Sequence, residues 1–354
     1  MENKKDKKES LAGNPSGINP KVAGKKQRRE YSTDEYVEGI KSGNRKMLGQ
    51  AITLVESFLP EHYSKAQEII EKCLPQSSES IRIGITGVPG AGKSTFIETF
   101  GLFLAGIDRK IAVLTIDPSS ENSKGSILGD KTRMEQLSTH PSVFIRSSPS
   151  SGSLGGVARK TREAIILCEA AGYDTILVET MGVGQAETEV HSMVDFFLLL
   201  MLAGAGDEIQ GIKRGIMEMA DMIAITKADG QNIANAENAR ILYQNAINLF
   251  PPAPSGWRPK VVACSARKNK GISELWDIID EYFTYTKGTG YFDELRKQQQ
   301  IVRMDNTIRE FLKHSFYNNK LVKQFRPEVE KQLSNGLITS YTAALTLLDK
   351  YFKK

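Results

Sequence analysis

The sequence has few of the residues that mark a secreted or membrane protein. It contains 3 cysteines in 354 residues, Cys73, Cys168 and Cys264, and no two of them form a Cys-x-x-Cys pair. An odd and isolated set argues against a disulfide framework and favours a reducing cytosol. The longest apolar run, Phe196 to Ala203, is too short to cross a bilayer, and no apolar signal segment lies near the amino terminus. We therefore expect a cytoplasmic protein that does not bind a membrane.

Clustered metal ligands and a strong excess of one charge are also missing. The 4 histidines are scattered, and no cysteine neighbours them, which argues against a Cys/His metal site. The formal net charge of +5 is modest, and the basic residues are spread along the chain apart from the amino-terminal tail. We therefore expect no nucleic-acid partner. A chain of this length can bury a full α/β core and still carry helical extensions.

The most informative segment predicts a phosphate-binding loop. A β-branched run from Ile83 leads into a glycine-rich stretch that fits G-x-x-x-x-G-K-[ST]. The glycines let successive backbone N–H groups point into one concavity, Lys93 can reach the terminal phosphates, and the Ser94 hydroxyl can join a Mg²⁺ shell. A chance glycine-rich turn is the alternative, which a preceding buried strand and a following helix would exclude. The predicted nucleotide-binding residues here are Gly87, Val88, Pro89, Gly90, Ala91, Gly92, Lys93, Ser94 and Thr95.

A second motif places an acid at the end of a buried strand. The apolar run from Asp174 to Thr180 contains Glu179 near its carboxyl end, and Gly182 follows shortly after. A carboxylate in this position holds Mg²⁺ directly or through water in Walker B motifs. Such an acid also occurs by chance, but its pairing with the phosphate loop favours the metal-binding interpretation.

Two further acids are candidate metal ligands. Asp117 and Asp130 bracket a polar segment between the phosphate loop and Glu179, where a GTPase carries its first switch. Together with Ser94 and Glu179 they form the predicted Mg²⁺ site. For Asp130 and the nearby Arg133, an ordinary solvated helix start is an equal alternative.

The segment Thr226-Lys227-Ala228-Asp229 predicts recognition of guanine. The Asp229 carboxylate can accept both hydrogen bonds from the guanine ring N–H and exocyclic amine, and the Lys227 stem can lie along the purine. This favours GTP over ATP, because adenine lacks that donor pair. The usual motif is Asn-Lys-x-Asp, so Thr226 is a departure. The loop expected to close over the base consists of Ser265, Ala266 and Arg267.

Apolar strand-like runs alternate with helical patterns and predict an α/β fold with a mostly parallel sheet flanked by helices. Ligands then bind beyond the carboxyl ends of the strands, where the motifs fall. Helical faces continue from Ile301 to Phe352, beyond what one sheet needs, and predict either a homodimer interface or an ordinary helical subdomain. The expected organisation is a disordered basic tail over 1–30, a helical extension over 31–78, a P-loop GTPase domain over 79–287 and a dimerisation arm over 288–354.

In combination these motifs resemble the MeaB/ArgK group of P-loop GTPases, the family of the methylmalonic aciduria type A protein. The resemblance is clear from Thr33 to Trp276. It implies a homodimeric chaperone of an adenosylcobalamin-dependent acyl-CoA mutase that hydrolyses GTP to GDP with Mg²⁺ and binds no cobalamin directly. It also implies a third switch over 204–215 that couples to the mutase, with Lys213 joining Lys93 and Glu179 as a catalytic residue. The matching segments are 87–95, 116–120, 128–134, 153–156, 179–185 and 204–215.

Two other functions remain as alternatives. A nickel-insertion GTPase would need a Cys/His cluster, which the sequence lacks. A small-molecule kinase would need an acceptor pocket and would not need Asp229. We also expect slow intrinsic turnover, because Val183 stands where Ras-like enzymes have a glutamine, and Gln185 lies two residues further along.

Overall fold

The computed structural model describes residues 30–57, 59–74, 80–117, 133–149, 154–180, 186–203 and 214–352. Among these residues, seven parallel strands form one sheet in the order β3-β2-β4-β1-β5-β6-β7. The predicted α/β class with a parallel sheet is confirmed. The strand bounds are β1 Ile81–Gly87, β2 Ile111–Asp117, β3 Val143–Pro149, β4 Thr175–Thr180, β5 Phe196–Leu202, β6 Met222–Thr226 and β7 Lys260–Ala263.

Strand β3 is longer than the sequence pattern indicates. Its apolar run stops at Arg146, yet Ser147 and Ser148 continue the ladder with β2 and are buried. The Ser148 hydroxyl donates to Glu56 Oε1 at 2.6 Å, and the Arg146 guanidinium forms an ion pair with the same carboxylate. Arg146 and Ser148 can therefore continue the strand, because a glutamate from a separate helix pairs with their buried polar groups.

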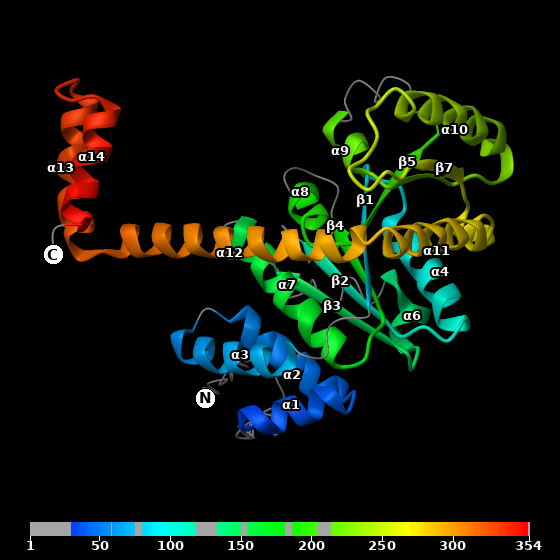
Figure 1. Ribbon diagram of the computed structural model, residues 1–354, viewed down its shortest axis with the longest axis horizontal. Helices are drawn as coiled ribbons and strands as arrows, with labels where there is room; N and C mark the ends of the chain where they lie inside the picture. Colours follow the sequence, from blue (N-terminus) through cyan, green and yellow to red (C-terminus); the bar gives the residue numbers. More distant parts are fainter. Residues whose placement is uncertain are drawn as a thin grey trace, which may run out of the picture.

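Helices cover both faces of the sheet (Figure 1). One face packs against α4, α6 and α11, and its core includes the stacked rings of Phe96 and Phe100. The opposite face packs against α7 and α8 over β2 and β4, and against α9 and α10 over the β5–β7 half. The bounds are α4 Lys93–Gly106, α6 Glu135–Thr139, α7 Leu154–Ala170, α8 Ala186–His191, α9 Arg214–Met219, α10 Ile233–Ile247 and α11 Ile272–Gly288.

Three amino-terminal helices extend the core beyond α7. They are α1 Thr33–Lys41, α2 Arg45–Glu56 and α3 Pro60–Cys73. Helix α1 begins with a capping box, in which Ser32 accepts from the Glu35 N–H and the Glu35 carboxylate accepts from the Ser32 N–H. Buried side chains such as Ile40, Leu48 and Ile69 join the same apolar cluster as α7. The extension therefore shares its hydrophobic core with the sheet domain.

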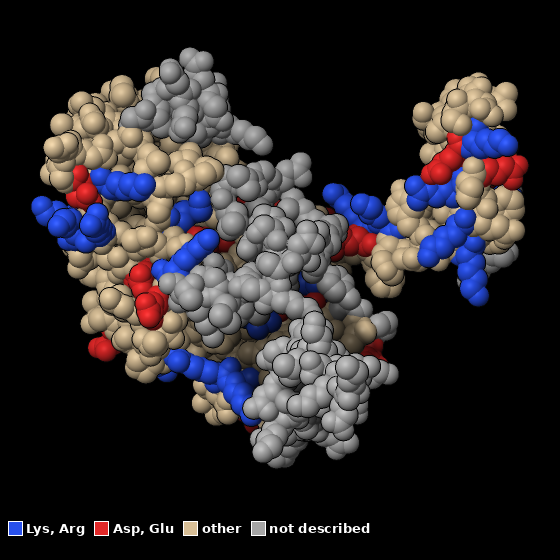
Figure 2. All heavy atoms as spheres, turned by 180° about the vertical axis from the view of Figure 1, so that it is seen from behind, with Lys and Arg blue, Asp and Glu red and all other residues tan. Residues whose placement is uncertain are grey.

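The carboxyl-terminal helices form an arm that leaves this core. Helix α12, Tyr291–Asn318, runs across the body and then away from it, and α13, Lys320–Ser334, and α14, Ser340–Phe352, pack side by side at its far end (Figure 1). From behind, the α13–α14 end stands clear of the body and carries both charges interspersed with uncharged surface (Figure 2). None of the helices in the described part of the chain is both long and apolar enough to span a bilayer.

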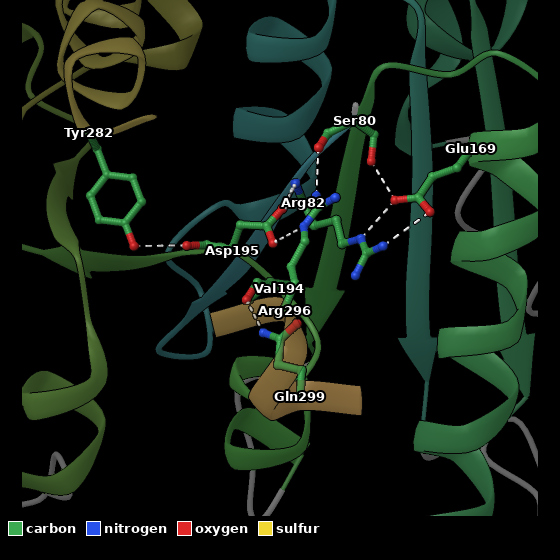
Figure 3. A network of polar contacts seen from close by, with 8 residues as sticks. All are labelled: Ser80, Arg82, Glu169, Val194, Asp195, Tyr282, Arg296 and Gln299. Carbon is green, nitrogen blue, oxygen red and sulfur yellow. Dashed lines mark hydrogen bonds and ion pairs between the residues drawn. The ribbon is translucent and has the colours of Figure 1, made fainter. Parts of the chain in front are cut away.

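Buried ionic contacts fix the first turns of α12 on the body (Figure 3). Arg296 donates to Asp195 Oδ2 at 2.7 Å and to the Ser80 carbonyl at 2.6 Å, while Gln299 donates to the Val194 carbonyl at 2.7 Å. The Asp195 side chain is fully buried and also accepts from the Arg82 N–H. The amino end of β1 and the residues before β5 therefore hold the base of the arm.

Candidate active site: a phosphate loop at the carboxyl edge of the sheet

The predicted phosphate loop joins β1 to α4, so the buried strand and the helix that its interpretation requires are both present. Gly87 is needed at the end of β1, because a Cβ there would collide with the Leu200 carbonyl of the neighbouring strand. Gly92 has φ = +80° at the start of α4, in the left-handed region that favours glycine. The backbone therefore curls between these two positions as a phosphate cradle does.

Lys93 lies across the loop that precedes it. Its ammonium donates to the Gly87 carbonyl at 2.9 Å and to the Val88 carbonyl at 3.4 Å. Burial lowers the pKa of Lys93, while the nearby carboxylates of Glu179 and Glu187 act in the opposite direction. Anionic phosphate oxygens would satisfy this cation better than carbonyl oxygens do.

Glu179 lies next to the loop, as its place in the sequence predicts. Strand β4 pairs with β1 in a register that places Glu179 level with Ile85. Glu179 is buried. The Ser94 hydroxyl lies 3.5 Å from Glu179 Oε1. A hydroxyl and a carboxylate are the hard oxygen ligands that Mg²⁺ prefers, so this pair fits the predicted metal.

The other predicted ligands are only partly placed. Asp117 ends β2, which pairs with β4, and its backbone therefore lies at the same edge of the sheet. Its side chain, Asp130 and Lys213 lie outside the described residues, as does most of the proposed third switch. That segment connects the end of β5 at Leu202 to the start of α9 at Arg214.

The predicted guanine-binding residues come together beside the phosphate loop. The Ser265 hydroxyl donates to the Asp229 carboxylate, linking the two base-binding segments. Lys227 has φ = +58°, and its Cε lies 3.9 Å from the position that a Cβ on Gly92 would occupy. Its stem therefore extends from the base-binding motif to the phosphate loop, while Arg267 is exposed at the rim.

Two threonines connect the base-binding segments to the phosphate loop and to α4 through hydrogen bonds. Thr226, which replaces the usual asparagine, donates to the Ala91 carbonyl of the phosphate loop at 2.8 Å and lies 3.1 Å from the Met201 carbonyl. Thr99, on α4, donates to the Ala266 carbonyl at 3.2 Å. The sequence offers no motif for Thr99, whereas Thr226 belongs to the predicted base-binding motif. The arrangement can bind a guanine nucleotide and promote phosphoryl transfer to water by positioning and charge neutralisation.

Comparisons with known proteins agree with this geometry. Residues 48–320 match the family described as methylmalonyl-CoA mutase-associated GTPase MeaB. The chain is 44% identical over 309 residues to the GTPase ArgK of Escherichia coli, covering 87% of this chain and 93% of that protein. It is 43% identical over 340 residues to the mouse mitochondrial methylmalonic aciduria type A homolog, covering 93% and 82% respectively.

A solved structure has the same architecture. A crystal structure described as a LAO/AO transport system kinase superposes with a TM-score of 0.73 at 36% sequence identity, covering 91% of this chain and 98% of that one. Both sequence and fold therefore match over nearly the whole chain, helical extensions included.

Proposed function

The chain belongs to the MeaB/ArgK family of GTPases, and from that premise we propose that it is a GTP-hydrolysing chaperone of an adenosylcobalamin-dependent acyl-CoA mutase. The observation that carries the partner assignment is the match of residues 48–320 to a family described by its association with methylmalonyl-CoA mutase. The chaperone gates cofactor loading and protects or reactivates the mutase, and it binds no cobalamin itself.

Mg²⁺ is the proposed cofactor of the reaction. Ser94 and Glu179 would hold it, with two further ligands: Asp117 at the end of β2, and Asp130 in the segment that follows β2. When bound, the ion supplies positive charge that offsets the charge developing on the phosphates. Lys93 adds a second positive charge at the same place, and its pKa is lowered by burial, which a phosphate ligand would oppose.

The proposed coupling to the mutase goes through the segment 204–215. The position of β5 supports this proposal, because β5 pairs with β1 up to Gly87 and therefore ends at the edge of the sheet that carries the phosphate loop. A segment at this edge can contact both the nucleotide and a partner protein. Coupling requires that the mutase contact this segment differently in the GTP and GDP states.

The deciding experiment measures GTP turnover with and without the cognate mutase. Lys213→Ala is expected to retain nucleotide affinity and to reduce the acceleration that the mutase produces. Lys46→Ala, at an exposed position on α2, is the matched control and should respond like the unmodified chain. Absence of any acceleration by the mutase would contradict the chaperone assignment, and equal acceleration of both variants would remove Lys213 from the coupling.

We further propose a homodimer held by the arm and a cytoplasmic location. The three cysteines are free and buried, as is common for proteins of a reducing compartment. Large apolar side chains remain exposed along α12, including Met304, Phe311 and Leu312. Exposed apolar surface of this kind supports an interface with a second copy.

A further inference from the structure

Helix α8 carries a buried carboxylate that the site described above does not use. Glu187 lies in the first turn of this six-residue helix and exposes only 2% of its surface. Its Oε2 atom is inaccessible to solvent and has no hydrogen-bond partner among the residues that the structure describes. Burying a carboxylate oxygen without a partner costs free energy, so such an atom requires an explanation.

The packing of α8 places Glu187 close to the phosphate loop. Val190 lies over β1 at Gly84, where a Cβ would come 3.0 Å from its Cγ1. Helix α8 connects the carboxyl edge of the sheet, after β4, to the amino edge, before β5, so it runs opposite to the strands. Glu187 precedes Val190 by three residues, on the same helix face, and lies about 4.5 Å closer to the carboxyl edge. That distance corresponds to one or two strand residues and brings Glu187 level with Ile85 or Thr86.

The surroundings of Glu187 are polar on this side of the sheet. Thr86 faces the same way as Gly84, since alternate strand residues share a face, and it accepts a hydrogen bond of 2.7 Å from the buried Thr180 hydroxyl. Thr86 is the residue before Gly87, whose carbonyl holds the Lys93 ammonium. The negative charges of Glu179 and Glu187 both act to raise the pKa of the Lys93 ammonium, so both carboxylates lie within electrostatic range of it. Two independent features, the unpartnered oxygen and the proximity to Lys93, therefore point toward the terminal phosphate.

The other acid of α8 provides a contrast. Glu189 is partly exposed and lies 3.6 Å from Arg162, which also donates to the Ser192 hydroxyl at 2.6 Å. This acid has an ordinary structural partner on a neighbouring helix. Glu187, two residues away, is buried and its Oε2 atom has no such partner within the described part of the chain, so the same short helix carries one structural and one unassigned carboxylate.

We infer that Glu187 is a catalytic residue, which accepts a hydrogen bond from the attacking water and orients it toward the γ-phosphorus. The inference rests on GTP hydrolysis, the activity of the family, and not on the mutase. The water oxygen forms the new bond to phosphorus, and the bond from phosphorus to the β–γ bridging oxygen breaks. GDP leaves with that electron pair, and the water proton passes through Glu187 to the released phosphate.

The test is single-turnover hydrolysis of GTP by the full chain with Mg²⁺. Glu187→Gln keeps the size of the side chain but loses the carboxylate base. It is expected to slow hydrolysis by about 10²-fold, at the lower end of what positioned proton transfer contributes. The dissociation constants for GTP and GDP should change less than about threefold. Glu189→Gln, the matched control from the same helix, should hydrolyse GTP like the unmodified chain.

A second variant separates catalysis from structure. Glu187→Ala leaves space near the reacting water, and added formate is expected to restore part of its rate, which a purely structural role would not allow. Unchanged hydrolysis in Glu187→Gln would overturn the proposal. So would a rate loss matched by an equal loss of GTP and GDP affinity, because Glu187 would then only position Lys93. A failure of formate to restore any rate in a folded Glu187→Ala variant would also count against it.

Discussion

At the scale of single residues, Thr226 shows how a departure from a motif is accommodated. The usual asparagine is replaced by a shorter side chain, yet the Thr226 hydroxyl still donates to the Ala91 carbonyl of the phosphate loop. Thr226 is buried at the end of β6, beside β5. The hydroxyl thus connects the base-binding segment to the phosphate-binding segment inside the protein, where water cannot replace it.

Removal of this hydroxyl should therefore weaken both stability and nucleotide binding. Thr226→Val keeps the shape of the side chain and leaves the Ala91 carbonyl without this donor, which is expected to lower the free energy of unfolding by about 1–2 kcal/mol. GDP affinity should fall as the loop loosens. Denaturant unfolding and GDP titration measure the two effects. Thr226→Ser retains the hydroxyl and is the control; a Thr226→Val chain as stable as Thr226→Ser would contradict the bridging role.

The sequence predicts some residues of the site and not others, for a physical reason. Lys93, Glu179 and Asp229 occupy fixed offsets from strand ends, so their motifs alone indicate where their side chains lie. Thr99 and Glu187 act from helices whose packing depends on the assembled sheet, and no local spacing marks them. Asp117, Asp130 and Lys213 remain predictions, because their side chains lie outside the described residues.

At the scale of elements, the base of α12 depends on a buried ion pair. The Asp195 side chain is fully buried, and Arg296 lies over the Phe292 ring, 4.3 Å from its centroid. Arg82, at the start of β1, forms a second pair with Glu169 of α7 at 2.7 Å. These contacts join the arm to the same strand that ends in the phosphate loop.

Removing one partner of the ion pair between Asp195 and Arg296 should greatly lower the free energy of unfolding. Arg296→Ala leaves the Asp195 charge buried and is expected to destabilise the chain by about 3–5 kcal/mol. Replacing both partners, as in Asp195→Asn with Arg296→Met, should cost much less, because no uncompensated charge remains. Thermal and denaturant unfolding of the single and double variants measure the difference. Equal losses in both would show that packing, and not the ion pair, holds the arm.

The connection between α9 and β6 contains a carboxyl group that should make stability depend on pH. Burial raises the pKa of Asp221 to about 7, although its carboxylate accepts a hydrogen bond from the Phe197 N–H. The folded chain then holds this proton more tightly than the unfolded chain, whose pKa is about 3.9. The contribution of Asp221 to stability is therefore most favourable below pH 4 and is lost as the pH rises toward 7.

Asp221→Asn should remove this dependence while keeping an acceptor for the Phe197 N–H. Relative to the unmodified chain, the variant is expected to gain stability progressively between about pH 4 and pH 7 and to gain no more above that range. Three pKa units correspond to about 4 kcal/mol, and the residue's partial exposure will reduce the gain below that value. Denaturant unfolding at several pH values measures it; a constant difference across the range would contradict the assignment.

The elements themselves were largely predictable, and the deviations have local causes. Strand β5 has the bounds that its apolar run predicts, because a strand buried on both faces needs no polar alternation. Strand β3 extends through two buried serines, and Glu56 of α2 accepts a hydrogen bond from the second of them, Ser148. Helix α8 is too short to show a periodic pattern, so no local spacing predicts it.

At the scale of the whole molecule, the arm exposes a stripe of apolar side chains. Ile301, Met304, Ile308 and Phe311 recur at spacings of three and four along α12, and each is about half exposed or more. The hairpin of α13 and α14 adds further exposed rings, including Tyr341 and Phe352. A single copy of the chain leaves this surface in water, which favours its burial against a second copy.

The residue at which the arm is truncated decides whether the role of its apolar stripe can be tested without also removing core contacts. Phe292 is buried in the core of the body. Arg296 and Gln299 form hydrogen bonds with the residues that directly precede β5. A chain ending at Gly290 loses all three and is expected to unfold at lower temperature. A chain ending at Glu310 keeps these contacts and removes the outer arm. The two truncations therefore separate loss of the outer arm, with part of the proposed interface, from loss of the core contacts.

We expect the full chain to be a dimer at micromolar concentration and the chain ending at Glu310 to be a monomer that still binds GTP. Light scattering during size-exclusion chromatography gives the masses, and GTP titration confirms that the site is intact. Phe311→Glu in the full chain, which places a charge on the stripe without shortening the arm, should also weaken the dimer. A full chain that stays monomeric would contradict the interface. A dimer that survives in the chain ending at Glu310 would place the interface on residues before Phe311, either on the body or on the part of the stripe that this chain retains, Ile301 to Ile308.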